Sequence, residues 1–257
     1  MHEHTFVRRT LEEFQAAKHL LSRDLSVRAV ARTLGLPYAT VRYWRDLEQP
    51  PRRLTRAASQ GWRPPCPAAY AYLLGAYLGD GCIGRTSPSG AQLTITLDAR
   101  YPKIVAEVDR SMRTCLPEAD VGSCARPGAT RLYSSHPAWL EAFPQHGPGR
   151  KHTRTIELVE WQLAITSEYP AALIRGLIHS DGSRSTNAFT TRLPSGRVAR
   201  YSYVRYFFTN YSADIRRIFC EHCDLLGIQW TQSSFKNISI AHRDSVALLD
   251  EIVGPKA

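Results

Sequence analysis

The chain has 257 residues, with 33 Lys and Arg against 23 Asp and Glu and a formal net charge of +10 at pH 7. At this length and 43% apolar content it can form one large domain, or a large and a small one, with ordinary buried cores. The positive charge favours nucleic acid as the partner, ahead of an anionic membrane surface. The longest apolar run, residues 68–79, is shorter than the roughly 20 residues of a spanning helix. No export signal core is present, so we expect a cytoplasmic protein without a membrane contact.

Two short helices are predicted near the N-terminus, after a supporting helix over residues 11–21. The first of the two has apolar residues at the spacing of one buried helical face: Val27, Val30, Ala31 and Leu34. Ser26 is a good N-cap for it, and Gly35 ends it. Pro37 suits the first turn of the next helix, whose apolar side carries Val41 and Trp44. Two helices therefore meet at a tight turn.

This pattern resembles a DNA-binding helix-turn-helix domain, which we place at residues 1–47. The resemblance implies that the second helix enters the major groove, with Tyr38, Ala39, Arg42 and Tyr43 facing base edges. Arg28 and Arg32 would then contact phosphates. An ordinary helical hairpin with a solvated basic face is the alternative. Residues 48–69 are rich in proline and arginine and lack an apolar period, so we interpret them as a linker.

The rest of the chain, residues 70–257, contains an internal repeat, with copies at about 70–150 and 151–257. Each copy begins with an apolar helix that ends in Asp-Gly, "LLGAYLGDG" at Asp80 and "IRGLIHSDG" at Asp181. A β-hairpin, a helix, two short strands and a last helix follow in each copy. The predicted order is αββαββα, twice, 101 residues apart between the two aspartates.

Small residues lie four apart on both of these helices: Gly75 and Gly79 on the first, Gly176 and Ser180 on the second. Two backbones can approach very closely along such stripes, and we expect the two helices to pack together there. Their C-termini would then deliver Asp80 and Asp181 to one small region. Two adjacent carboxylates repel unless a cation lies between them, and a hard divalent ion such as Mg²⁺ suits oxygen ligands.

The paired segments resemble the two signature motifs of single-chain LAGLIDADG homing endonucleases. The resemblance covers about residues 70–256, and it implies an α+β fold: two pseudo-symmetric αββαββα repeats that form a DNA-straddling saddle, here preceded by the small all-α domain. It implies that Asp80 and Asp181 bind the catalytic metals. It also implies a basic residue near the active centre, for which Lys236 fits by position in the second copy, and Arg131 or, less directly, Lys151 in the first.

We therefore predict a monomeric, Mg²⁺-dependent endonuclease that hydrolyses double-stranded DNA, without an organic cofactor, in the cytoplasm at the nucleoid. Side chains of the hairpins and of the inter-repeat segment are expected to bind DNA: Arg85, Lys151, Arg192 and Arg205. The alternative is a transcription regulator of the same architecture that binds DNA without cutting it. The two facing acids favour cleavage, because a pure binder does not need carboxylates that repel phosphate.

A cysteine pair and a histidine are interpreted as structural residues. Cys220 and Cys223 lie within a predicted helix and lack a second cysteine pair at zinc spacing, so we expect packing rather than a zinc site. His179 adjoins the predicted site, where hydrogen bonding at the helix interface is favoured over proton transfer.

Overall fold

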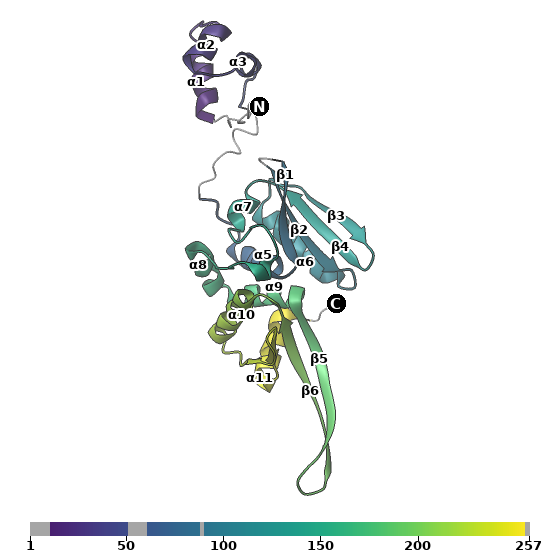
Figure 1. Ribbon diagram of the computed structural model, residues 1–257. Helices are drawn as coiled ribbons and strands as arrows, with labels where there is room; N and C mark the ends of the chain where they lie inside the picture. Colours follow the sequence, from purple (N-terminus) through teal and green to yellow (C-terminus); the bar gives the residue numbers. More distant parts are fainter. Residues whose placement is uncertain (1–10, 51–60, 88–89, 255–257) are drawn as a thin grey trace. The chain divides into compact units, whose positions relative to one another are not determined.

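The computed structural model describes residues 11–50, 61–87 and 90–254, and of Leu11 and residues 85–87 only the backbone. The chain divides into two compact units, Met1–Gly61 and Trp62–Ala257 (Figure 1). The larger unit holds two four-stranded antiparallel sheets and helices that cover them. The predicted α+β fold class is confirmed. Within the described ranges, no helix has the length and apolar character that crossing a bilayer would require.

The described residues of the N-terminal unit, 11–50 and 61, form three helices: α1 (Leu11–Leu21), α2 (Val27–Thr33) and α3 (Tyr38–Arg45). Ser26 caps α2 as the sequence predicts, because its side chain accepts a hydrogen bond from Ala29 N at 3.2 Å. Gly35 has φ +64°, and Leu36 N donates to the carbonyl oxygen of Ala31 at 2.9 Å. This is the glycine-terminated helix end that makes a tight turn possible. The core of the unit is apolar: Phe14, Ala17, Val30, Ala31, Leu36, Val41 and Trp44.

The predicted linker, residues 48–69, extends too far toward the C-terminus. Trp62 packs edge-on against Tyr70 at 5.7 Å between ring centroids and against Trp161 at 6.0 Å. Helix α5 begins at Pro67. Composition marked these residues as linker because their prolines obscure the apolar period, although a proline at the first helical turn is compatible with a helix. Residues 51–60 lie outside the described part of the chain.

The larger unit contains the predicted repeat. The first copy consists of α5 (Pro67–Asp80), β1 (Gly81–Ser87), β2 (Gly90–Asp98), α6 (Pro102–Cys115), β3 (Val121–Arg126), β4 (Ala129–Ser135) and α7 (Trp139–Ala142). The second consists of α9 (Pro170–Asp181), β5 (Gly182–Arg192), β6 (Val198–Thr209), α10 (Ala213–Leu225), β7 (Thr231–Gln232), β8 (Asn237–Ile240) and α11 (Arg243–Val253). A 3₁₀ turn, η1 (Lys151–Thr153), and α8 (Glu160–Glu168) lie between them. The strand orders, β1-β2-β4-β3 and β5-β6-β8-β7, are the same.

Each sheet has one face on the core and one face away from it. In β2, Leu93, Ile95 and Leu97 are buried in the core, and the intervening residues alternate to the opposite face. That opposite face of the first sheet is mostly polar: Gln92, Thr94, Thr96, Arg131, Tyr133 and Ser135. The apolar alternation therefore orients a mostly polar surface outward in the first copy.

The two hairpins differ in length. Strands β5 and β6 pair over eleven residues of β5, from Gly182 opposite Phe208 to Arg192 opposite Val198. They extend from the body of the unit as a two-stranded ribbon (Figure 1), whereas β1 and β2 stay within their sheet. A turn with Gly196 at φ +78° closes the ribbon, and Leu193 N donates to Arg197 O at 2.8 Å. The two copies therefore share one topology but differ in the length of their hairpins.

Candidate functional site

Helices α5 and α9 pack in direct backbone contact. A Cβ on Gly75 would lie 2.5 Å from the carbonyl oxygen of Leu173, and one on Gly176 would overlap the carbonyl oxygen of Tyr72. Further along, a Cβ on Gly79 would overlap the side chain of Ser180. The four small residues singled out in the sequence therefore lie at one crossing, where any larger side chain would separate the helices.

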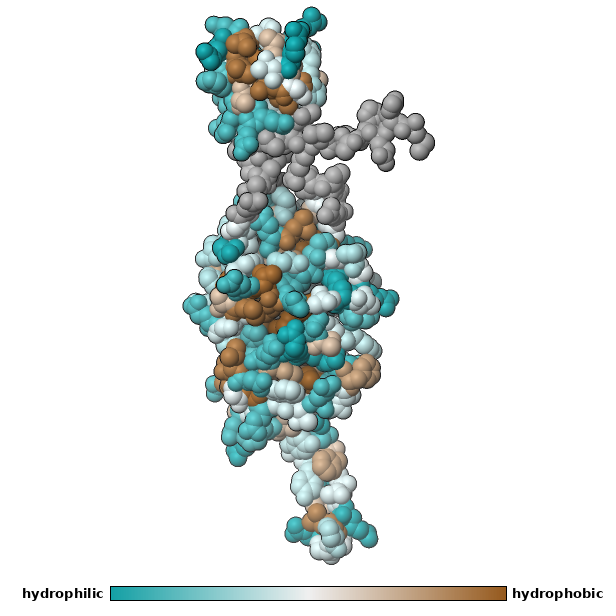
Figure 2. Space-filling view, turned by 60° about the vertical axis from the view of Figure 1, so that its left-hand side comes forward, coloured by the Kyte–Doolittle hydropathy of each residue, from teal (hydrophilic) through white to brown (hydrophobic). Residues whose placement is uncertain are grey.

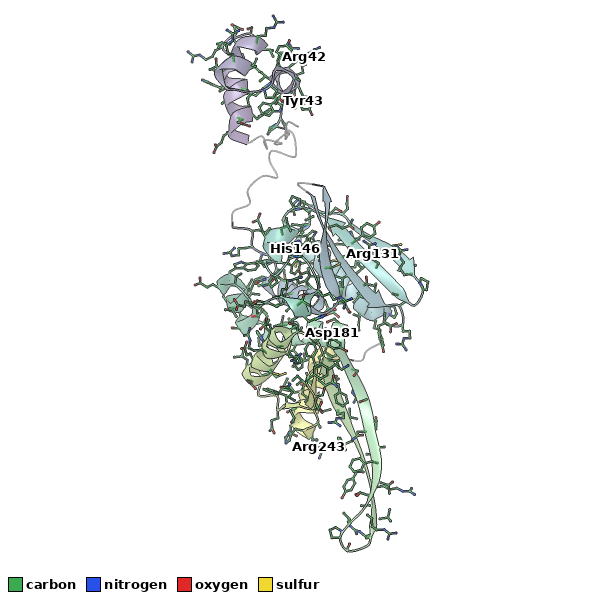
Figure 3. All side chains as sticks on the ribbon, in the orientation of Figure 1. Arg42, Tyr43, Arg131, His146, Asp181 and Arg243 are labelled. Atoms are coloured by element: carbon green, nitrogen blue, oxygen red, sulfur yellow. The ribbon has the colours of Figure 1, made fainter. Side chains whose placement is uncertain are left out.

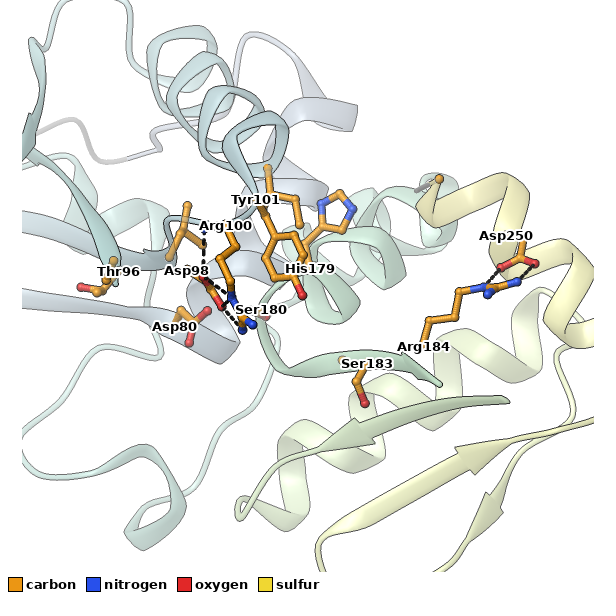
Figure 4. A pocket seen from close by; sticks show the side chains of 15 residues that line it. Asp80, Thr96, Asp98, Arg100, Tyr101, His179, Ser180, Ser183, Arg184 and Asp250 are labelled. Carbon is orange, nitrogen blue, oxygen red and sulfur yellow. Dashed lines mark hydrogen bonds and ion pairs between the residues drawn. The ribbon is translucent and has the colours of Figure 1, made fainter. Parts of the chain in front are cut away.

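Asp80 and Asp181 are the last residues of these two helices. The position of a Cβ on Gly79 is 3.1 Å from Asp181 Oδ2, so the carboxylate of Asp181 lies against the residue that precedes Asp80. Both aspartates are half-buried. Figure 3 shows Asp181 where β5 leaves the helix pair, and the close view in Figure 4 shows Asp80 near Ser180. The structure thus brings both acids to the ends of the crossing helices.

Lys151 lies at the same place, in the segment between the repeats. Its ammonium donates to three carbonyl oxygens at the C-terminal end of α5: Tyr77 at 2.6 Å, Leu78 at 2.8 Å and Gly79 at 2.7 Å. These carbonyls carry the negative end of the helix dipole, which a cation stabilises. Burial lowers the pKa of Lys151 to about 8, although the charges of Asp181 and Asp80 oppose that shift. Its ammonium points toward these carbonyls inside the protein and is not directed outward for the DNA contact that the sequence predicted for Lys151.

Lys236, expected near the acids by its position in the second repeat, points elsewhere. Its ammonium donates to the hydroxyl of Tyr211 at 3.1 Å and lies 4.9 Å from the centre of that ring. Only its backbone is close to the site, because Asn210 N donates to Lys236 O at 3.0 Å. Of the basic residues that the sequence offered for this place, the side chain of Lys151, the less direct candidate in the first copy, lies at the helix ends, and that of Lys236 does not.

Asn210 was missed from the sequence. Its side-chain amide donates to Asp181 Oδ2 at 2.6 Å, from the turn that joins β6 to α10. Its side-chain oxygen accepts a hydrogen bond from Ser212 N at 2.8 Å, which fixes the orientation of the amide. Asn210 thus orients the carboxylate of Asp181. A turn asparagine is a common feature, and the sequence offered no signal that this one faces an acid.

A cavity opens beside Asp80, with walls from both repeats (Figure 4). The first repeat contributes Asp98 and Arg100, which form an ion pair at 2.6 Å. The second contributes Arg184, which pairs with Asp250 at 2.8 Å. Asp250 lies on α11, and it also accepts a hydrogen bond from the hydroxyl of Tyr206 at 2.6 Å. The two contacts together connect the base of the ribbon to α11.

The donor set at the helix ends fits a hard divalent cation. Among the described residues there is no group of three or more His, Cys, Asp and Glu side chains that could enclose a metal ion. The helix ends themselves carry two carboxylates, Asp80 and Asp181. Mg²⁺ commonly binds through one or two carboxylates, keeps several waters and takes further oxygens from substrate phosphates. The residues present therefore suit Mg²⁺ bound together with a phosphodiester.

His179 belongs to the helix interface. It is 5% exposed, with Nε2 3.2 Å from the carbonyl oxygen of Val253 and Nδ1 3.0 Å from the hydroxyl of Tyr72. A carbonyl oxygen only accepts, so Nε2 donates to Val253, while Nδ1 forms the hydrogen bond with the Tyr72 hydroxyl. This arrangement is the hydrogen-bonding role expected for His179.

Two arginines lie on the sheet faces directed away from the core. Arg131 on β4 donates to Gln92 Oε1 at 3.3 Å and Thr94 Oγ1 at 3.4 Å. Arg205 on β6 donates to Ser239 Oγ at 2.7 Å. Strand alternation puts Arg192 on the opposite face of the ribbon from Arg205, which separates two residues that the sequence had grouped. The side chain of Arg85 lies outside the described residues.

The residues predicted to bind DNA in the N-terminal unit are all exposed: Arg28, Arg32, Tyr38, Ala39, Arg42 and Tyr43. Figure 3 shows Arg42 and Tyr43 on α3. In contrast, the cysteine pair lies in a core. Cys220 and Cys223 are buried on α10, and burial raises the pKa of Cys220 to about 12. Between them His222 donates from Nδ1 to the carbonyl oxygen of Ile218 at 2.7 Å.

The buried ammonium of Lys151 predicts a pH dependence of stability. With divalent ions chelated, the unfolded chain binds a proton at Lys151 up to about pH 10.5, whereas the folded chain releases it near pH 8. The contribution of this group to the free energy of unfolding is therefore full above pH 10.5 and is lost as pH falls toward 8. Relative to Lys151→Met, the native protein should gain up to about 3 kcal/mol between pH 7.5 and 10.5 in urea unfolding. Parallel pH profiles would contradict this.

The chain is similar to solved structures, whereas the comparisons by sequence found no match. No protein-family model matches the chain, and no curated protein matches it. The structure of I-DmoI in complex with DNA and Mn has 15% sequence identity, covers 74% of this chain and 98% of its own, and has a TM-score of 0.49. The meganuclease I-AabMI bound to uncleaved DNA has 10% identity, coverages of 71% and 82% and a TM-score of 0.44. I-SmaMI bound to cleaved DNA has 11% identity, covers 74% of this chain and 83% of its own, and has a TM-score of 0.44. These three similar structures are of a homing endonuclease, I-DmoI, a LAGLIDADG meganuclease, I-AabMI, and a LAGLIDADG homing endonuclease, I-SmaMI.

Proposed function

We propose that the protein is a metal-dependent endonuclease that cleaves double-stranded DNA at a specific sequence. The observation that carries the proposal is the pair Asp80 and Asp181, which terminate two helices in backbone contact. Carboxylates at such a crossing repel one another and repel phosphate. A divalent ion bound between the carboxylates and a scissile phosphate would attract all of these groups and so remove both repulsions.

In this mechanism Asp80 and Asp181 hold Mg²⁺. When bound, Mg²⁺ polarises a phosphoryl oxygen and lowers the pKa of an attacking water. Asn210 keeps Asp181 oriented through its hydrogen bond to Oδ2. Lys151 neutralises the carbonyl end of α5 and the negative charge of the two acids before metal and DNA arrive. The outward sheet faces, with Arg131 and Arg205, bind the flanking duplex.

The N-terminal unit would supply a second DNA contact as a helix-turn-helix. This proposal is supported by the turn glycine Gly35 with its positive φ, by the small apolar core, and by the exposure of the early residues of α3. Insertion of α3 in the major groove would place Arg42 against base edges and Arg28 against phosphate. The same contacts by the N-terminal unit would also suit the alternative, a regulator that binds an operator without cutting. A cleaving domain with its own DNA-binding surface does not need contacts from a second unit, so these contacts do not distinguish the two functions. We further propose that the protein acts as a monomer in the cytoplasm.

The experiment that tests the proposal is selection from a randomised duplex library in Ca²⁺, followed by transfer of the selected duplexes to Mg²⁺. Ca²⁺ is larger and looser in geometry, so it should hold the complex without supporting turnover. We expect sequence-specific binding in Ca²⁺ and double-strand scission in Mg²⁺. Specific binding without scission in Mg²⁺ or Mn²⁺ would reject the enzyme and support the regulator, and the absence of specific binding would reject both.

Two substitutions distinguish base recognition from phosphate contact in the N-terminal unit. Arg42→Ala should weaken binding by about 1–3 kcal/mol at particular base pairs and relax selection there. Arg28→Ala, the matched control on α2, should weaken binding to all sequences and reduce the salt dependence by about one ion. The measurement is repeated library selection together with titrations across salt concentrations. If both variants only weaken binding uniformly, α3 does not read bases.

A further inference from the structure

The β5–β6 ribbon carries a cluster of exposed aromatic side chains that nothing in the catalytic site uses. Phe189 and Tyr201 are directly opposite one another, with stacked rings 5.4 Å apart, and each is 45% exposed. Tyr203 meets Phe189 edge-on at 6.3 Å and is held by Asn187 Nδ2, which donates to its hydroxyl at 2.8 Å. We call Phe189, Tyr201 and Tyr203 the aromatic ladder.

The aromatic ladder shares a ribbon face with Arg205. Residues that are paired across the strands, and every second residue along each strand, project to the same side. Asn187, Phe189, Tyr201, Tyr203 and Arg205 satisfy this rule. The guanidinium of Arg205 lies 5.8 Å from the Tyr203 ring centre, which continues the row toward the body of the unit. Figure 2 shows hydrophobic surface on the ribbon, at the lower end of the view, beside hydrophilic surface.

The charge of the ribbon indicates which kind of partner binds the face that carries the aromatic ladder. Between Gly182 and Thr209 the sequence has five arginines and no acidic residue. Arg205 lies on the same face as the aromatic side chains, Arg192 and Arg200 lie on the opposite face, and Arg184 pairs with Asp250. The ribbon is therefore net positive, and DNA phosphates complement that charge better than an apolar protein surface does. The major groove of B-form DNA admits a two-stranded β-ribbon, and the one strongly apolar group that it exposes is the C5-methyl of thymine.

We infer that the aromatic ladder reads thymine methyl groups in the half of the DNA target that the β5–β6 ribbon covers. The inference rests on the proposed DNA-binding function and deepens it. The outward face of the first sheet carries chiefly polar side chains such as Gln92 and Thr96, so its half-site is read by hydrogen bonds instead. The two halves of the target therefore differ in the chemistry that specifies them.

The length of the ribbon places these thymines. Asn187, opposite Tyr203, is six residues from Asp181, and Phe189 is eight. At about 3.3 Å per residue these separations are roughly 20 and 26 Å. At about 3.4 Å per base pair, a ribbon that lies along the groove puts the contacted thymines roughly six to eight pairs from the cleavage centre.

The test replaces thymine with deoxyuridine, which removes only the methyl group, in a duplex selected from the randomised library in Ca²⁺. Each replacement at the contacted thymines of the ribbon half-site, roughly six to eight pairs from the cleavage centre, should weaken binding about fourfold, because a buried methyl contributes about that factor. Replacements in the other half-site should leave binding within about twofold. Equal binding of thymine and deoxyuridine duplexes, or equal losses in both halves, would overturn the inference while leaving the DNA-binding function intact. Failure to select any duplex would instead reject the proposed function.

Protein variants separate reading from ribbon stability. In the double variant with Phe189→Ala and Tyr201→Ala, thymine and deoxyuridine duplexes should bind equally, because the methyl contact is gone. Val198→Ala, which trims an exposed apolar side chain on the opposite ribbon face, should keep the full discrimination. A double variant that binds more weakly but still distinguishes thymine from deoxyuridine would overturn the inference and assign the aromatic ladder to holding the ribbon together.

Discussion

Asp181→Asn and Asp80→Asn should each reduce Mg²⁺-dependent cleavage by at least about a hundredfold. Removal of groups that only support a metal ligand commonly costs 10- to 100-fold, so loss of a ligand itself should exceed that range. Asparagine has the same shape and lacks the charge that holds the metal. Affinity for DNA in Ca²⁺-free buffer should be retained or raised, because each substitution removes a negative charge near phosphate. Cleavage and binding are measured on the duplex selected from the library.

A matched carboxylate provides the control. Asp109 on α6 pairs with Arg113 at 2.9 Å, away from the helix crossing. Asp109→Asn makes the same chemical change in the same domain and should leave cleavage within about twofold, since a surface ion pair contributes little. Wild-type cleavage by either Asp80→Asn or Asp181→Asn would remove that aspartate from the proposed site.

Gly176→Ala should destabilise the protein by at least about 3 kcal/mol. The added methyl would overlap the carbonyl oxygen of Tyr72 and lie 2.9 Å from Ala76 N. Both neighbours are backbone atoms, so no side chain can rotate to make room, and the helices must separate. Urea unfolding should show a lower midpoint with an unchanged slope.

Gly84→Ala is the matched substitution without a clash. Gly84 lies in β1, and no atom lies within 4 Å of the position its Cβ would take. Its stability should change by less than about 0.5 kcal/mol, as for surface substitutions in general. Equal losses in Gly176→Ala and Gly84→Ala would mean that the close helix approach is not what makes Gly176 necessary.

The sequence predicted the repeated elements well because periodicity reports them directly. The apolar spacing of residues 102–116 and 212–226 corresponds to α6 and α10, and the paired Asp-Gly segments correspond to α5 and α9. These signals depend only on neighbours along the chain and on which face is buried.

The site was predicted less completely, because part of it comes from irregular segments. Asp80 and Asp181 lie at the ends of periodic helices, so their location follows from the pattern. Lys151 and Asn210 lie in a 3₁₀ turn and in a strand-to-helix turn, whose paths no periodicity describes. Lys236 was chosen by position in the repeat, yet its side chain turns to Tyr211.

The contact between Gly75 and Gly176 also bears on how the protein tolerates mutation. The closest contacts at Gly75 and Gly176 are between main-chain atoms, so they do not depend on the rotamer of a side chain. We therefore expect substitutions elsewhere in the core of the larger unit to change the melting temperature more than they change the approach of the two helices.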